Sequence, residues 1–177
     1  MFLILPCLIE FTIPYVPDPY VFRFDGRFRF LSLSLVKDCW TRKSRQGVIT
    51  HTSYFVVKEF NDDIIWKKEL QVLEELRGLR GVARLLGSGR RMNGGPFIVT
   101  ENAGEPTNKD VEEPSDWYDV APLIGEIHAR GWHHHDLHGG NVLNNGKGNL
   151  TVIDFGNAVR AADCVGDCPD NLWMDDI

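Results

Sequence analysis

The sequence predicts an α+β fold in which a small antiparallel sheet precedes a mainly helical region. Between residues 21 and 101, short stretches alternate apolar and polar side chains, as half-buried strands do. One segment in that part, residues 64–79, has its apolar residues at helical spacing instead. The composition then turns polar and afterwards helical. We therefore expect an N-terminal extension of unknown role at 1–20, a sheet-containing lobe at 21–101, and a second lobe at 102–177.

The strands are predicted from their alternation and from the turns between them. Val21 to Leu35 alternates apolar residues with arginines and serines around Asp25-Gly26, which predicts a hairpin. Thr41 to Gly47 is predicted to be a basic loop. Further strands are expected at residues 48–50, 53–60, 82–86 and 97–101. The last two are expected to be joined by a turn through Ser88-Gly89 and residues 93–95.

Two amphipathic helices and a second hairpin complete the predicted elements. The helix at 64–79 begins after Asn61 to Asp63, which supply capping oxygens, and it ends at Gly78 and Gly81. A second helix has four apolar residues on one face: Trp117, Val120, Ile124 and Ile127. Its expected N-cap is Ser115 or Asp116, and its expected end is Gly131. Residues 142–143 and 150–153 should pair around Asn145-Gly146.

The composition is that of a globular protein in a reducing compartment. The net charge of −6, from 19 basic and 25 acidic residues, disfavours nucleic acid or an acidic membrane surface as a partner. The four cysteines, Cys7, Cys39, Cys164 and Cys168, form no paired disulfide framework. Met1 to Ile13 lacks a basic leader and is too short to span a bilayer. We expect a cytoplasmic or nuclear protein.

The most informative segment is a histidine- and glycine-rich loop that contains an Asp and, five residues later, an Asn. It reads His134-His135-Asp136-Leu137-His138-Gly139-Gly140-Asn141-Val142-Leu143. After a Gly/Asn-rich turn comes Val152-Ile153-Asp154-Phe155-Gly156. Phosphoryl transfer needs a carboxylate that orients a hydroxyl nucleophile and oxygen ligands for the metal ions that bridge the ATP phosphates. The two motifs together predict a phosphoryl-transfer site.

Upstream residues extend this pattern in chain order. Val56-Val57-Lys58 places a lysine at the end of an apolar run, Glu69 lies in the first predicted helix, and Phe97 to Glu101 is a predicted strand before the polar crossing. With these segments, residues 54–157 resemble the protein kinase-like superfamily. The resemblance implies a kinase-like fold with a small antiparallel-sheet N-lobe and a truncated, mainly helical C-lobe.

The resemblance also implies ATP and Mg²⁺ as cofactors and gives the loop residues their roles. Asp136 would orient the substrate hydroxyl and accept its proton. Asn141 and Asp154 would coordinate Mg²⁺, which prefers hard oxygen ligands. The acceptor is expected to be a protein or small-molecule hydroxyl.

The nucleotide contacts that the resemblance implies lie in the first lobe. Lys58 would contact the ATP phosphates, and Glu69 would hold it there through an ion pair. Thr100 would guard the back of an adenine pocket. Glu101 and Ala103 would offer hinge carbonyl and amide groups to the base.

Three histidines of the loop qualify the resemblance. His134 is expected to pack structurally. His135 replaces an arginine that often anchors a phosphorylated activation loop, so no such switch is expected. His138 replaces a lysine, and Asp-Leu-His-Gly-Gly-Asn is closer to aminoglycoside phosphotransferases and related small-molecule or atypical kinases.

Two departures from the family leave a second function open. Residues 31–53 contain only Gly47, so no glycine-rich phosphate loop is present. Only twenty-one residues follow Gly156, among them Asp170 to Trp173, which faintly resembles the start of a helix that anchors the catalytic loop. Leu137 and Val142 would then have little to pack on, and such an exposed patch favours either instability or a protein partner that covers it. The alternatives are an inactive pseudokinase or binding scaffold, or a fragment of a longer kinase.

A zinc-binding protein is the third hypothesis, and the sequence disfavours it. His133, His134, His135 and His138 lie close together in the chain. Adjacent histidines on an extended loop point in different directions, and Cys164 and Cys168 lie far along the chain, so we expect unremarkable cysteines.

Overall fold

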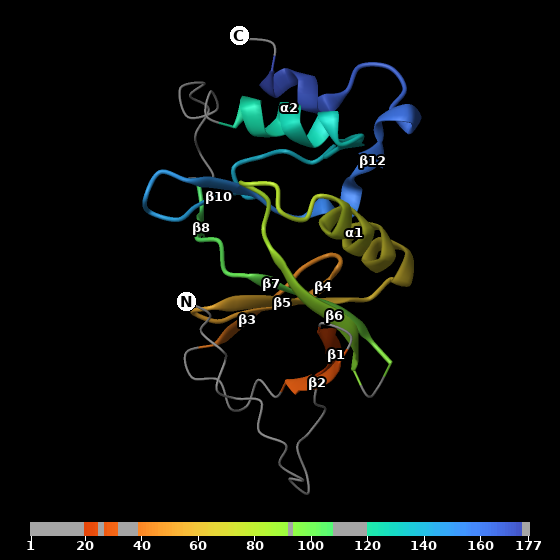
Figure 1. Ribbon diagram of the computed structural model, residues 1–177, viewed down its shortest axis with the longest axis vertical. Helices are drawn as coiled ribbons and strands as arrows, with labels where there is room; N and C mark the ends of the chain where they lie inside the picture. Colours follow the sequence, from red (N-terminus) through yellow and green to blue (C-terminus); the bar gives the residue numbers. More distant parts are fainter. Residues whose placement is uncertain (1–19, 25–26, 32–38, 92–93, 108–119, 175–177) are drawn as a thin grey trace, which may run out of the picture.

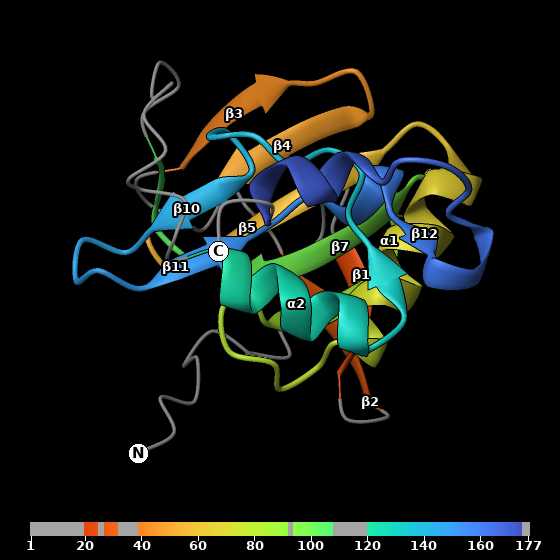
Figure 2. The same ribbon diagram turned by 90° about the horizontal axis from the view of Figure 1, so that it is seen from above.

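The structure, a computed structural model, describes residues 20–24, 27–31, 39–91, 94–107 and 120–174. It is a mixed α+β arrangement, as predicted. In Figure 1 the strands of the main sheet occupy the lower half, helix α2 (Ala121–Ala129) lies at the top, and helix α1 (Asp63–Glu75) lies between them. Seen from above in Figure 2, α2 and the C-terminal segment are stacked over the sheet.

The main sheet is antiparallel, and within the described residues it has seven strands. These are β1 (Tyr20–Phe24), β2 (Arg27–Leu31), β3 (Trp40–Lys43), β4 (Gly47–His51), β5 (Phe55–Phe60), β6 (Leu85–Arg91) and β7 (Pro96–Glu101). Their order in the sheet is β2-β1-β6-β7-β5-β4-β3. The strand that carries Lys58, β5, is therefore an interior strand, with β4 on one side and β7 on the other.

The hairpin predicted at the start of the sheet is confirmed. β1 and β2 pair antiparallel, with Phe24 opposite Arg27. The expected turn at Asp25-Gly26 and the continuation through Leu33 and Leu35 lie outside the described residues. β1 also pairs with β6, so the hairpin widens the sheet at the edge opposite β3.

Two of the predicted loops are wrong. Residues 41–43 belong to β3, which pairs with β4, and only Ser44 to Gln46 turn; the Ser44 hydroxyl donates to the Gly47 carbonyl across that turn. Ser88-Gly89 does not turn but lies inside β6, which begins three residues later than expected. In both cases pairing with neighbouring strands outweighed weak local preference for a strand.

The helices follow the predicted signals with shorter bounds. Asp62 is the N-cap of α1, and its Oδ1 accepts hydrogen bonds from the amides of Ile64 (2.6 Å) and Ile65 (3.3 Å). The helix ends at Glu75, before Gly78 at φ 85°. α2 ends before Gly131, whose φ of 80° is that of a glycine terminator. The expected caps at 115–116 lie outside the described residues.

The C-terminal half contains short strands and 3₁₀ turns. They are β8 (Glu105–Pro106), β9 (Trp132–His133), β10 (Val142–Asn144), β11 (Leu150–Val152), η3 (Phe155–Asn157), β12 (Val159–Arg160), η4 (Ala161–Asp163) and η5 (Pro169–Trp173). β10 and β11 form the predicted hairpin, and β8 joins its other edge. β12 pairs with β9, which returns the chain to the start of the histidine-rich loop.

One apolar core joins the sheet to the C-terminal half. Ile98 of the sheet, Ile124 of α2 and Phe155 of η3 belong to the same cluster, and each is at most 1% exposed. The predicted exposure of the loop's underside is wrong for Val142, which is also 1% exposed and belongs to this cluster. Leu137 is partly buried against it. Residues of α2 and α1 supply the packing that the sequence did not reveal.

The end of α1 is attached to the C-terminal half by polar contacts as well. Glu75 accepts hydrogen bonds from Trp132 Nε1 (3.0 Å) and from Arg160 Nη2 (2.6 Å). The Arg160 guanidinium lies 4.0 Å from the centre of the Trp132 ring. Helix α1 is thus fixed to β9 and β12 at its C-terminal end.

Neither helix could cross a lipid bilayer; within the described part of the chain, no helix is long and apolar enough.

Two glycines offer a matched test of these packing assignments. A Cβ on Gly47 would lie 1.9 Å from the Glu59 carbonyl oxygen of β5, so Gly47→Ala should lower the free energy of unfolding by ~2–4 kcal/mol. Gly125 in α2 has no atom near its Cβ position, so Gly125→Ala should raise it by up to about 1 kcal/mol. Urea denaturation of both variants checks the signs. Equal effects would contradict the close pairing of β4 and β5.

Candidate active site

Lys58 lies at the centre of a buried cluster of three charged residues. Its Nζ is 2.7 Å from Oε2 of Glu69 on α1 and 2.6 Å from Oδ1 of Asp154, which is 96 residues away in the chain. The Lys58 side chain is 11% exposed and that of Glu69 6%, whereas Asp154 retains 29%. The lysine therefore connects the sheet, α1 and the C-terminal half, and the open side of the cluster lies at Asp154.

Burial and charge act in opposite directions on this cluster. Burial by itself would lower the pKa of Lys58, but the neighbouring Glu69 and Asp154 carboxylates outweigh it and raise that pKa. Burial raises the pKa of Glu69 to about 7, against the opposing effect of the Lys58 ammonium. Lys58 is thus firmly charged at neutral pH, while Glu69 is close to its titration point.

Asp154 is held by an unusual backbone and by the residue that follows it. Its φ of 63° lies in the left-handed region, which residues other than glycine rarely adopt. Phe155 is fully buried, and its ring meets that of His134 with centroids 4.9 Å apart. The buried ring on one side and Lys58 on the other keep the Asp154 carboxylate at the cluster.

The loop carrying Asp136 is held by a hydrogen bond within the loop and by two to the segment after β11. Asn157 Nδ2 donates to Oδ2 of Asp136 (2.9 Å), and Asn141 Nδ2 donates to the Asp136 carbonyl (2.9 Å). The Asn141 carbonyl in turn accepts from the amide of Ile153, next to Asp154 (2.9 Å). The structure thus brings together Asp136, Asn141 and Asp154, as the sequence predicted.

The histidines of this loop have different surroundings. His134 is fully buried, its Nε2 lies 2.9 Å from the Ile153 carbonyl, and burial lowers its pKa. It therefore packs structurally, as expected. His138 is exposed, and its Nδ1 accepts from the Gly140 amide (3.0 Å), so it shapes the turn before Asn141.

Asp170 supports the loop from below. Its carboxylate is fully buried and accepts hydrogen bonds from the backbone amides of His134 (2.5 Å) and His135 (2.8 Å). His128 Nε2 of α2 lies 3.0 Å from the same carboxylate. Burial would raise the pKa of Asp170, but these three contacts outweigh it and lower the pKa. The faint resemblance at Asp170 to Trp173 thus corresponds to a real anchor.

The predicted hinge residues lie at the end of β7. Thr100 is opposite Val56, so its side chain is on the same sheet face as Lys58, two residues further along β5. The Glu101 amide is not available to a nucleotide base, because it donates to the Arg84 carbonyl (3.0 Å), and the Glu101 carboxylate accepts from the amide and Nε of Arg84. Within the described residues the Ala103 amide has no hydrogen-bond partner. Asn102 fixes the segment by donating from Nδ2 to the Thr52 carbonyl (2.8 Å).

Two further contacts were not predicted from the sequence. Gln46, in the turn between β3 and β4, lies against Gly156: a Cβ on that glycine would be 2.6 Å from Gln46 Nε2. Its buried Oε1 has no hydrogen-bond partner within the described residues. Asn157 was missed likewise, since it is an ordinary polar residue after a motif. Only the folded chain shows that Gln46 and Asn157 face the motifs.

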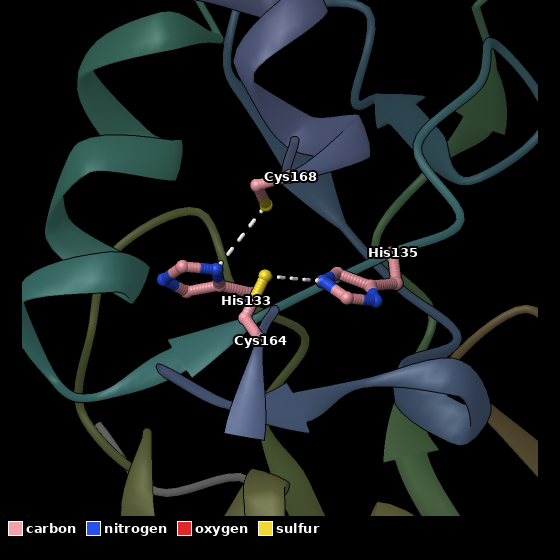
Figure 3. A group of neighbouring side chains, drawn as sticks. All are labelled: His133, His135, Cys164 and Cys168. Atoms are coloured by element: carbon pink, nitrogen blue, oxygen red, sulfur yellow. Dashed lines mark hydrogen bonds between the residues drawn. The ribbon is translucent and has the colours of Figure 1, made fainter. Parts of the chain in front are cut away.

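Cys164 and Cys168 are free thiols, as expected, but the expectation that they lie apart from the histidines is wrong. Figure 3 shows Cys164 and Cys168 facing His133 and His135, although 29 and 35 residues separate the pairs in contact. His133 lies in β9, and His135 reaches the same cluster from a left-handed backbone (φ 61°), whereas the His134 ring between them packs against Phe155. The β9–β12 pairing then brings the cysteine segment beneath them.

Comparison with known proteins adds no assignment, because no protein-family model and no curated protein matches the sequence.

The raised pKa of Glu69 predicts a measurable pH dependence of stability. Because Glu69 binds its proton more tightly when folded than when unfolded, the free energy of unfolding should fall as pH rises from 4.5 to about 7. Glu69→Gln should remove this slope. Urea denaturation of both proteins across that pH range measures it. An unchanged slope in the variant would show that Glu69 is not buried as a carboxyl group.

The anchor at Asp170 predicts a large loss of stability on truncation. Asp170→Ala would leave two buried backbone amides without acceptors, which should cost about 2–5 kcal/mol. The control is Asp167→Ala, an exposed aspartate three residues earlier, which should change stability by less than about 0.5 kcal/mol. Thermal unfolding of the two variants measures the loss of stability in each. An equally small loss in both would exclude the anchoring role of Asp170.

Proposed function

We propose that this protein is an ATP- and Mg²⁺-dependent phosphotransferase of the protein kinase-like superfamily, which transfers the γ-phosphate to a protein or small-molecule hydroxyl. The observation that carries the proposal is the position of Lys58, between Glu69 and Asp154. The three residues come from a strand, a helix and a loop that follows the Asp136 segment. These are the three charged groups that the motifs of such an enzyme require.

The free-energy cost of removing these charged groups from water supports a functional role for the cluster. A buried ion pair recovers its desolvation cost only with good geometry, and apolar residues of similar size often serve stability equally well. A buried lysine held by two carboxylates, with one of them partly exposed, suits a site that exchanges a carboxylate contact for an anionic ligand. Phosphate oxygens are ligands of that kind.

The chain's own groups suit the remaining steps. The Asp136 carboxylate would orient an acceptor hydroxyl and take its proton as the oxygen attacks the γ-phosphorus. Asn157 Nδ2 donates to Oδ2 of Asp136 and so fixes the carboxylate, which leaves Oδ1 of Asp136 to accept the proton of the acceptor hydroxyl. Lys58, held by Glu69, would bind the negatively charged phosphates.

The donor set also fits Mg²⁺. The Nδ2 of Asn141 is engaged with the Asp136 carbonyl, which leaves its Oδ1 for a ligand. Asp154 uses Oδ1 for Lys58 and retains Oδ2. Oxygen donors of this type are those that Mg²⁺ prefers, and the bound ion would neutralise phosphate charge. At the hinge, the unpartnered amide of Ala103 would serve the nucleotide base.

A binding module without catalysis is the second candidate, and Gln46 is the observation that favours it. Its side chain lies on Gly156, beside the position where phosphates would approach Asp154. The turn between β3 and β4 also has a single glycine, Gly47, whereas loops whose backbone amides cradle phosphates usually have several.

Calorimetric titration with ATP, with and without Mg²⁺, tests the proposal. The wild-type protein should bind ATP in a Mg²⁺-dependent manner. Lys58→Met and Asp154→Asn should each weaken binding at least ~10-fold, or ~1.4 kcal/mol. Lys67→Met, at an exposed lysine of α1, is the matched control and should bind like wild type.

Activity then separates the two candidates. An enzyme should hydrolyse ATP or transfer its γ-phosphate. Asp136→Asn should abolish this activity without weakening ATP binding. ATP binding without transfer to any hydroxyl would favour the binding module. A folded wild-type chain that binds no nucleotide would overturn the proposal.

A further inference from the structure

Four side chains with metal-binding atoms converge beneath the histidine-rich loop. His133 ends β9, His135 lies two residues later, Cys164 follows η4, and Cys168 precedes η5. In Figure 3 the two imidazoles and the two thiols point toward one another, with Cys168 above and Cys164 below. Nδ1 of His133, Nε2 of His135 and the two Sγ atoms all lie within 4.8 Å of one another.

The separations of these atoms are close to those of a tetrahedral site. Cys168 Sγ is 3.2 Å from His133 Nδ1, and Cys164 Sγ is 3.2 Å from His135 Nε2. Zinc binds nitrogen at about 2.0–2.1 Å and sulfur at about 2.3 Å, so neighbouring ligand atoms on a tetrahedron are roughly 3.5 Å apart. Small side-chain shifts bring the two 3.2 Å pairs and the looser remaining pairs to that spacing.

The donor types select the class of metal. Two sulfurs and two imidazole nitrogens suit Zn²⁺ and similar d-block ions, whereas Mg²⁺ and Ca²⁺ require oxygen ligands. Without an ion, the two thiols would be held only by weak hydrogen bonds of sulfur among the described residues, with Cys168 6% exposed. Four protein ligands also leave no position for a reacting water, which is typical of a structural site.

The surroundings hold the histidines in place. The Asp170 carboxylate accepts a hydrogen bond from the His135 amide. His135 has a left-handed backbone, with a φ of 61°. The His133 ring stacks on His128, with centroids 4.0 Å apart, and His128 bonds to Asp170. An observed strain of this kind often marks a site where a side chain must point in one direction.

We propose that His133, His135, Cys164 and Cys168 form a structural zinc site that fastens the histidine-rich loop to the C-terminal segment of the chain. The ion would link residues 133–135 to residues 164–168. This inference does not rest on the proposed function, because metal content is measured without nucleotide or acceptor.

Elemental analysis of the full chain, expressed with zinc and purified without chelator, is the first test. We expect one zinc per chain. The double variant Cys164→Ser/Cys168→Ser should lose it, while Cys39→Ser, at an exposed cysteine outside the cluster, should retain it. Less than a tenth of an equivalent in the wild type, or an unchanged content in the double variant, would overturn the proposal.

Cobalt substitution of the wild-type chain gives a readout even if the double variant fails to fold. Co²⁺ at this site should produce the visible bands of tetrahedral cobalt and a near-ultraviolet thiolate-to-cobalt band, both of which Zn²⁺ abolishes. Cobalt bound without the thiolate band would place it elsewhere and overturn the assignment. So would a Cys164–Cys168 disulfide, detected by mass spectrometry, in a metal-free protein.

Discussion

The arrangement of this molecule depends on one buried cation. Within the described residues, Lys58 of β5 forms ion pairs both with Glu69 of helix α1 and with Asp154, in the segment after β11. A single buried ammonium cannot be left without partners, since an unpaired buried charge costs several kcal/mol. The lysine therefore fixes how α1 lies on the sheet and where Asp154 lies relative to both. The apolar core through Ile98, Ile124 and Phe155 acts in the same direction.

The Asp136 loop is ordered differently, by backbone amides and side-chain amides rather than by charge. Asp170 holds its beginning from below, Asn141 closes it, and Asn157 holds the Asp136 carboxylate from the side. Fixed polar contacts of this kind position a reacting group before a substrate arrives, which is the main contribution a protein makes to phosphoryl transfer. In our proposals Asp136 and Asn141 of this loop take part in phosphoryl transfer, while His133 and His135 at its start bind a metal.

Local sequence patterns predicted the parts of the fold that short-range physics decides. The Asp62 cap, the Gly131 terminator and the hairpin of β10 and β11 follow from capping oxygens, a positive φ and a turn dipeptide. The pairing of Lys58 with Glu69 followed from a resemblance. The errors arise where distant segments meet. Residues 41–43 and the pair Ser88-Gly89 lie in strands because neighbouring strands pair with them, and Cys168 meets His133 because β12 pairs with β9. No local signal records such contacts.

The attachment of α1 at both its middle and its end has a consequence for regulation. Glu69 binds Lys58, while Glu75 binds Trp132 and Arg160, so an outward swing of the helix would break a buried ion pair and the polar contacts at its end together. Such a movement would cost several kcal/mol, more than a single surface modification typically supplies. A ligand that displaced Asp154 from Lys58 would therefore leave α1 in place, because the helix is held through Glu69 and Glu75 and not through Asp154.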